Sequence, residues 1–341
     1  MRGSHHSNEW IRRERSIGIN SGSGQGASCF HRTTPRPRPF TFFWIALIAL
    51  LSVTCGSGCR LLNNSAPSPK ILASRQLNLR GTDALQRGHW EEAEHHFQRA
   101  IGQCPTDERS RAGHAEALWQ RGEWALAIRQ MEEGVELSGG DPEMLVRLGE
   151  MRLARGDRDG ASVCVERALL TKRQLASAWA LQGDVQRSTG DLDAALGSYH
   201  RALQSQPHFY RVELAVAEVY QQQNRPQRAL STLDALSDQY PPHQIPAQVH
   251  YLRGVTQRAL ARYDEAAASL SQAVKAGPVP ATCLTQLADC QLRLGDLPAA
   301  RATIAEGQRR FPQDNRFPQL LAQLEQGQPS MASLDRPFGA Q

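Results

Sequence analysis

The sequence repeats itself with a period of 34 residues, and this period limits the fold more than any other feature of the chain. A short turn segment recurs seven times, and successive copies lie 34 positions apart except for one interval of 37. The segments begin at Gly88, Gly122, Gly156, Gly190, Asn224, Ala261 and Gly295. The longer interval coincides with Pro241–Pro246, which adds three residues to a loop. A unit of this length holds two helices of about a dozen residues each and two short turns.

Small residues recur at two fixed places in the unit. The first helix carries a glycine or alanine at Gly81, Ala115, Gly149, Gly183, Ala217, Gly254 and Ala288. The second helix carries an alanine at Ala93, Ala127, Ala161, Ala195, Ala229, Ala266 and Ala300. Four positions after each of these alanines comes a larger apolar residue: Phe97, Met131, Val165, Tyr199, Leu233, Leu270 or Ile304. Since offsets of three and four share one helix face, we expect these positions to mark the helix crossings.

The ends of the predicted helices carry their own signals. Glycine opens five of the seven turn segments, and asparagine, the next best residue for a left-handed backbone, opens a sixth. Ala261 opens the remaining one, where we expect mild strain. Prolines that stop the second helix follow in five units, at Pro105, Pro207, Pro241, Pro278 and Pro312.

This pattern resembles the tetratricopeptide repeat over about residues 74–314. The resemblance implies an all-α fold, a right-handed α-solenoid of about seven helix-turn-helix repeats in which the first helix of each repeat lines a concave groove. Residues 315–326 are expected to add a capping helix, so that the solenoid spans 74–326. Residues 60–73 are interpreted as a linker and 327–341 as a disordered tail.

The first 39 residues differ in composition from the rest. They hold seven arginines, two glutamates and no lysine, which accounts for the whole formal charge of +5, and the remaining chain is neutral. We interpret 1–39 as a disordered basic leader. Because the excess charge lies outside the repeats, the sequence argues against a nucleic-acid face on the folded part. Residues 40–54 then run without a charge, enough for roughly 22 Å of helix.

Residues 40–59 are interpreted as the apolar region of a signal peptide or as a membrane anchor. The segment resembles a bacterial lipoprotein signal, which implies lipidation of Cys59, preceded by Ser57 and Gly58. Gly56 departs from the aliphatic residue of that pattern. Three alternatives stay open: a lipoprotein, an uncleaved anchor, and a cleaved soluble form. The arginines before the apolar run keep that end in the cytoplasm, so each alternative exports the repeats to the periplasm.

The sequence offers little chemistry. It contains no glycine-rich phosphate loop, nucleophile elbow or zinc-protease motif, so we expect no enzyme, no cofactor and no small-molecule substrate. His95 and His96 are adjacent and point about 100° apart on a helix, which disfavours a metal site with His89 and His114. The scattered cysteines are expected to be free thiols, at Cys104, Cys164, Cys283 and Cys290.

The groove is the surface on which we expect function. The residue after the small one in the first helix faces the concave side in the resembled family, and it is acidic in five of seven repeats: Glu116, Glu150, Asp184, Glu218 and Asp289. One interpretation is recognition of a protein partner with a basic segment. The alternative is that this wall is merely polar, and that Arg147, Arg187 and Arg258 neutralise it.

The sequence therefore predicts a non-catalytic protein–protein interaction scaffold, attached to the membrane of the bacterial envelope by its anchor or lipid and exposed to the periplasm, which binds a peptide or helix. An accessory subunit that recruits a separate envelope enzyme, such as a polysaccharide synthase or a cell-wall hydrolase, is the alternative.

Overall fold

A computed structural model of the chain describes residues 68–241 and 243–325. Within them the chain forms fifteen α-helices and no strand. The helices are α3 (Pro69–Gln86), α4 (Trp90–Gln103), α5 (Glu108–Arg121), α6 (Trp124–Leu137), α7 (Pro142–Ala154), α8 (Arg158–Thr171), α9 (Ala176–Ser188), α10 (Leu192–Ser205), α11 (Tyr210–Gln222), α12 (Pro226–Ser237), α13 (Ala247–Ala259), α14 (Tyr263–Ala276), α15 (Ala281–Arg293), α16 (Leu297–Arg310) and α17 (Arg316–Glu325). The chain divides after Pro105 into two compact units, the first with α3 and α4 and the second with α5 to α17.

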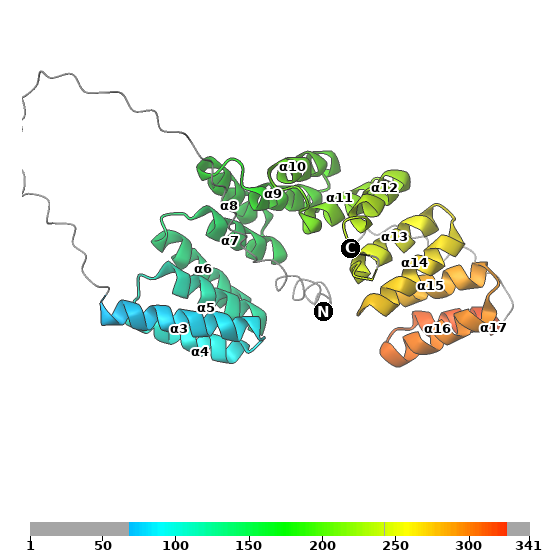
Figure 1. The fold of residues 1–341 in the computed structure, drawn as a ribbon, viewed down its shortest axis with the longest axis horizontal. Coiled ribbons are helices and arrows are strands. Elements are labelled where there is room, and N and C mark those ends of the chain that lie inside the picture. The colour runs from blue at the N-terminus through cyan, green and yellow to red at the C-terminus, as the bar shows by residue number, and fades with distance from the viewer. Residues whose placement is uncertain (1–67, 242, 326–341) are drawn as a thin grey trace, which may run out of the picture. The chain divides into compact units, whose positions relative to one another are not determined.

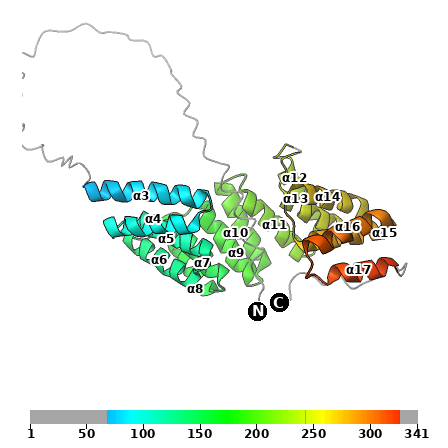
Figure 2. The same ribbon diagram turned by 90° about the horizontal axis from the view of Figure 1, so that it is seen from below.

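The helices are organised as pairs. Each odd-numbered helix from α3 to α15, called the A helix, packs on the even-numbered B helix that follows it. Both views show α3 beside α4, and α17 beside α16 (Figure 1, Figure 2). In the second unit each B helix also packs on the next A helix, so the pairs of that unit contact their neighbours in sequence. This confirms the predicted all-α fold of stacked helical repeats.

The turns within the pairs have the predicted backbone. All seven turn residues adopt a positive φ, between 55° at Asn224 and 86° at Gly190. Ala261 is among them, with a φ of 58°. An L-residue with a Cβ costs roughly 1–2 kcal/mol in this region, so Ala261 stores the strain that the sequence indicated.

The small residues lie where helices meet. The seven B-helix alanines are fully buried. The A-helix glycines make room for large side chains: a Cβ on Gly81 would lie 2.8 Å from Cζ of Phe97, and one on Gly183 would lie 2.4 Å from Cε1 of Tyr199. Both aromatic rings come from the B helix of the same pair. Glycine at these positions therefore lets a bulky B-helix residue sit directly against the A-helix backbone.

The longer repeat keeps the same packing. The extra residues fall between α12 and α13, a connection that is longer than the other links between pairs. Beyond it, a Cβ on Gly254 would lie 2.6 Å from Cγ of Leu270, as close as the equivalent contacts in other repeats. The insertion therefore changes the loop and leaves the register of the next pair unchanged.

The start of the folded region differs from the predicted linker 60–73. Helix α3 begins at Pro69, because Ser68 caps it: the Ile71 N–H donates to the Ser68 hydroxyl at 3.4 Å, and proline suits the first helical position. The last five residues of the predicted linker are thus helical. The leader 1–39, the segment 40–59 with Cys59, and the tail 327–341 lie outside the described residues.

The predicted capping helix is α17. Its Phe317, Leu320 and Leu324 are buried against the last pair, and Leu321 is partly buried there. A Cβ on Gly307 of α16 would meet the Phe317 ring, so this ring packs directly against the backbone of the last B helix. Helix α17 thereby covers the apolar face that the last pair would otherwise leave open.

Candidate interaction surface

The five predicted acidic residues are all ion-paired with arginines of the chain itself. Arg147 of α7 lies between two of them, with Nη2 2.8 Å from Oε2 of Glu116 and Nη1 3.0 Å from Oε2 of Glu150. Arg211 of α11 reaches back to the same Glu150, at 3.4 Å, and to Asp184, at 3.3 Å. Arg147 and Arg211 therefore connect side chains of four successive A helices, α5, α7, α9 and α11.

The chain of pairs ends at α11. Arg187 of α9 contacts Asp184 at 3.8 Å and Glu218 of the next A helix at 2.5 Å. The buried hydroxyl of Tyr199 donates to Oδ1 of Asp184 at 2.7 Å and holds that carboxylate from below. We name the connected set the arginine–carboxylate ladder. Its members are Glu116, Arg147, Glu150, Arg211, Asp184, Arg187 and Glu218.

Two of the ladder arginines, Arg147 and Arg187, keep their charge although they are largely buried. Burial alone would lower the pKa of Arg147, but the charges of Glu116 and Glu150 outweigh it and raise that pKa above its ordinary value. The pKa of Arg187 is raised in the same way, against burial, by Tyr199, Glu218 and Asp184. Four carboxylates and three guanidiniums leave the ladder with a formal charge of −1.

Asp289 of α15 has a different setting. Its side chain is completely buried and lies 3.5 Å from Arg258 Nη1 and 3.1 Å from Arg293 Nε. Arg293 also donates to the Tyr263 hydroxyl at 3.1 Å and lies over the Tyr263 ring. One carboxylate between two guanidiniums carries a formal +1, so this cluster balances the ladder.

The predicted acidic wall is therefore neutral, and the alternative interpretation describes it better. Arg147, Arg187 and Arg258, the three arginines named from the sequence, all pair with the predicted acids. Sequence reasoning missed Arg211, which joins two earlier repeats. An offset of 31 residues, about one repeat less one helical turn, separates Glu116 from Arg147 and Arg187 from Glu218. Arg211 follows Asp184 by 27 residues and Glu150 by 61, so this spacing does not indicate it.

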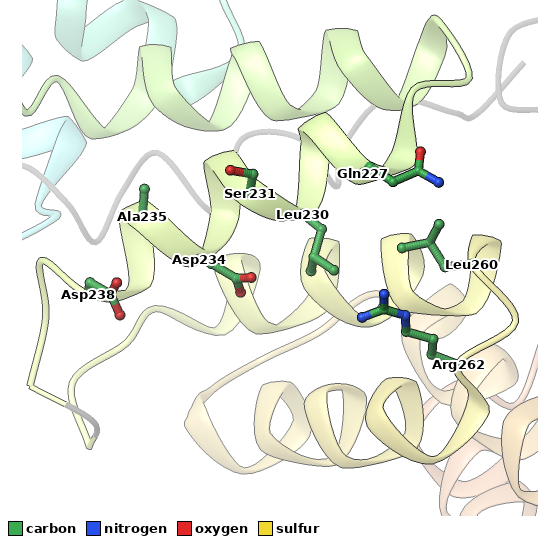
Figure 3. A pocket seen from close by; sticks show the side chains of 8 residues that line it. All are labelled: Gln227, Leu230, Ser231, Asp234, Ala235, Asp238, Leu260 and Arg262. Carbon is green, nitrogen blue, oxygen red and sulfur yellow. The ribbon is translucent and has the colours of Figure 1, made fainter.

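A shallow pocket lies elsewhere, between α12 and the turn that joins α13 to α14. Figure 3 shows Leu230 of α12 pointing toward Leu260 and Arg262 of that turn, with Asp234 further along α12 and Asp238 just after its end. Asp234 pairs with Arg253 at 3.0 Å. The lining holds one hydroxyl, that of Ser231, and no histidine, cysteine, tyrosine or lysine.

The histidines and cysteines have ordinary surroundings. His89 and His96 each lie within 3.6 Å of Glu92, and His114 within 3.3 Å of Gln130. In the described ranges no three metal-ligating side chains converge, and the cysteines there are free thiols. Burial raises the pKa of the Cys283 and Cys290 thiols to about 12, which keeps both protonated at neutral pH. Among the described helices none combines the length and the apolar character needed to cross a bilayer.

Most of the described chain matches models of one protein family. One tetratricopeptide repeat model matches residues 78–142, 146–210 and 251–315, and a second matches 187–254. Together the matches cover more than half of the sequence. No curated protein matches the chain significantly.

Solved structures show the same fold. A tetratricopeptide repeat protein from Parabacteroides merdae is 16% identical, with a TM-score of 0.54 over 71% of this chain and 90% of that one. A chain of the Cut9–Hcn1 complex is 17% identical over 75% of this chain and 43% of its own length, with a TM-score of 0.49. PilF of Pseudomonas aeruginosa is 14% identical over 74% and 99% of the two chains, with a TM-score of 0.47. At these identities the first likeness shows the fold alone.

Proposed function

The chain belongs to the tetratricopeptide repeat family, and from this premise we propose that it is a protein-binding scaffold tethered to the bacterial envelope, with its repeats in the periplasm. Tetratricopeptide repeats are generally non-catalytic and bind protein partners. The A-helix face is the natural binding surface, because it presents a connected set of charged side chains from α5 to α11.

The ladder is the observation that carries the binding proposal. Its side chains are held in fixed positions by shared ion pairs, yet they stay partly exposed, from 16% at Glu116 to 44% at Arg211. A partner therefore meets preordered donors and acceptors of both signs and loses little side-chain entropy on binding. We propose that the partner is a peptide or helix with both acidic and basic side chains, in place of the purely basic segment suggested by the sequence.

The binding proposal is tested by capture from membranes. The full chain is crosslinked in place and purified as the wild type, as Glu150→Gln with Arg211→Gln, and as Lys172→Gln. Lys172 is the matched control, because it forms an exposed ion pair with Glu143 away from the ladder. We expect the ladder variant to lose most of the captured partner and the control to keep it, with melting curves that show both folded. Equal capture by all three proteins contradicts the proposal.

The identity of the captured protein separates the two functional alternatives. A partner with its own active site supports an accessory subunit that recruits an envelope enzyme. A structural component of an envelope assembly supports the simple scaffold.

The tether is supported by the sequence alone. An arginine-rich leader precedes the charge-free run 40–54, and Cys59 follows two small residues. We propose that this region attaches the chain to the membrane as a lipoprotein or as an uncleaved anchor. Labelling with radioactive palmitate distinguishes them: a lipoprotein loses the label in Cys59→Ala and keeps it in Cys55→Ala, whereas an uncleaved anchor stays unlabelled and sediments with membranes. A chain recovered only in the soluble fraction refutes the tether.

A further inference from the structure

Among the described residues, none covers the outer face of α3 in the way that a preceding repeat covers the same face of α9, α11 and α13. The residue two positions before the small one is Leu181 in α9, Ala215 in α11 and Leu252 in α13, which are 0%, 7% and 7% exposed. Each packs against the preceding repeat; Leu181, for example, lies against Gly149. The equivalent residue of α3 is Leu79, which is 72% exposed.

This face is not prepared for a further repeat. Two positions after the small residue, five later A helices carry fully buried side chains: Ala117, Met151, Val219, Thr256 and Cys290. In α3 the same position is Asp83, which is half exposed and pairs with Arg87. Five positions before the small residue, α3 has the exposed Gln76 where later repeats bury Ser110, Ala178, Val212, Val249 and Cys283. Polar residues at these two positions mark the end of a repeat array.

Apolar and basic side chains share the rest of the face and the first turn of α3. Leu72 lies two helical turns before Leu79, on the same side, and is 46% exposed. Arg75 and Arg80 are exposed beside these leucines, and within the described residues neither is ion-paired with a carboxylate. Apart from the Asp83–Arg87 ion pair, the face thus combines exposed leucines with two arginines that lack a carboxylate partner in the described residues, and such a mixture suits contact with an anionic bilayer.

We propose that this face of α3, with Leu72, Leu79, Arg75 and Arg80, docks on an anionic lipid surface. The proposal rests on the tether of the proposed function. Residues 55 to 68 separate the charge-free run from α3, and 14 extended residues span at most about 50 Å, so the tether keeps α3 close to the bilayer. A second copy of the chain suits the face less well, because a two-fold contact would bring the unpaired arginines of both copies together.

The test uses the full chain reconstituted into vesicles of phosphatidylcholine, with or without phosphatidylglycerol. An environment-sensitive fluorescent amino acid replaces Gln76 on the proposed face. In a second preparation it replaces Leu170 of α8, a leucine that is 82% exposed and far from α3 in sequence. Doxyl-labelled lipid quenches a probe that reaches the bilayer. We expect blue-shifted emission and strong quenching at position 76 in the anionic vesicles only, and neither effect at position 170.

Charge reversal measures how much the two arginines contribute to docking on the lipid surface. Each basic residue near an anionic surface contributes about 1 kcal/mol, a factor of about five, so Arg75→Glu with Arg80→Glu should weaken docking by at least about 25-fold. The variants change exposed residues, and a melting curve checks their folding. A vesicle-bound chain with no quenching at position 76 overturns the docking and leaves the tether intact. A chain that does not associate with either kind of vesicle overturns both. A blue shift in neutral vesicles that grows with protein concentration shows self-association, which also overturns lipid docking.

Discussion

Replacing Tyr199 by phenylalanine isolates one contact beneath the ladder. The ring is fully buried against Gly183, and phenylalanine keeps the same packing. Only the hydroxyl is lost, with its 2.7 Å hydrogen bond to Asp184. A hydrogen bond to a charged group contributes about 1.5–3 kcal/mol. Because Arg187 and Arg211 still compensate the Asp184 carboxylate, we expect the free energy of unfolding to fall by an amount near the lower end of this range, about 1.5–2 kcal/mol.

The assay is urea unfolding followed by far-ultraviolet circular dichroism, with Tyr220→Phe as the matched control. The Tyr220 side chain is partly exposed, and its hydroxyl makes no hydrogen bond within the described residues. We expect Tyr199→Phe to lower the unfolding midpoint and Tyr220→Phe to leave it unchanged. Equal midpoints for the two variants would refute the role of the hydroxyl.

Alkaline pH provides a second, independent readout. Burial, together with the nearby Asp184 charge, raises the pKa of Tyr199 well above its ordinary value near 10. Above pH 10 the unfolded chain therefore ionises this tyrosine while the folded chain keeps the proton, so the contribution of Tyr199 to stability is complete below about pH 10 and decreases as the pH rises. The stability difference between the wild type and Tyr199→Phe should narrow by up to about 1.4 kcal/mol per pH unit. A constant difference up to pH 11 would contradict the buried geometry.

Four further substitutions, one of them a control, test the packing, a turn and an ion pair, each by chemical unfolding. Gly183→Ala should destabilise the protein by about 1–3 kcal/mol, because the new Cβ meets the Tyr199 ring. Its control, Gly197→Ala, lies in an open helical position and should stabilise the protein by about 0.5–1 kcal/mol. Stability changes of the same sign in both variants would be inconsistent with the helix crossing at Gly183. Ala261→Gly should stabilise by about 1 kcal/mol by relieving a φ of 58°, and a loss of stability would argue against that backbone. Asp314→Asn should lower the free energy of unfolding at neutral pH, because a hydrogen bond from Arg316 holds the pKa of Asp314 below the ordinary 3.8. This contribution is lost as the pH falls through the pKa of the folded state, so the wild type and the variant should be equally stable in strong acid. A stability difference that persists in strong acid would exclude the mechanism.

The repeat register was accessible from sequence because it depends on local, recurring chemistry. A left-handed turn favours glycine or asparagine, and a helix crossing favours a small side chain, so each repeat reports the same requirement independently. Even the exception at Ala261 could be predicted, since its strain follows from its position in the unit.

Two features required the structure. Arg211 acts across two repeats, on Glu150 and Asp184, and no single repeat shows that connection. The start of α3 was missed although Ser68 and Pro69 are a capping signal, because the polar stretch before them was interpreted as a linker up to residue 73. Capping is decided by one residue, and composition averaged over a segment hides it.

The loop between α12 and α13 shows where this architecture accepts additional chain. Three extra residues enter there, and the Gly254–Leu270 crossing still forms beyond them. Because stability is shared between neighbouring pairs and a longer loop adds little closure entropy, the cost of lengthening this connection stays local. An epitope, a protease site or a fluorescent domain inserted at this junction should therefore leave the helices before it and after it folded.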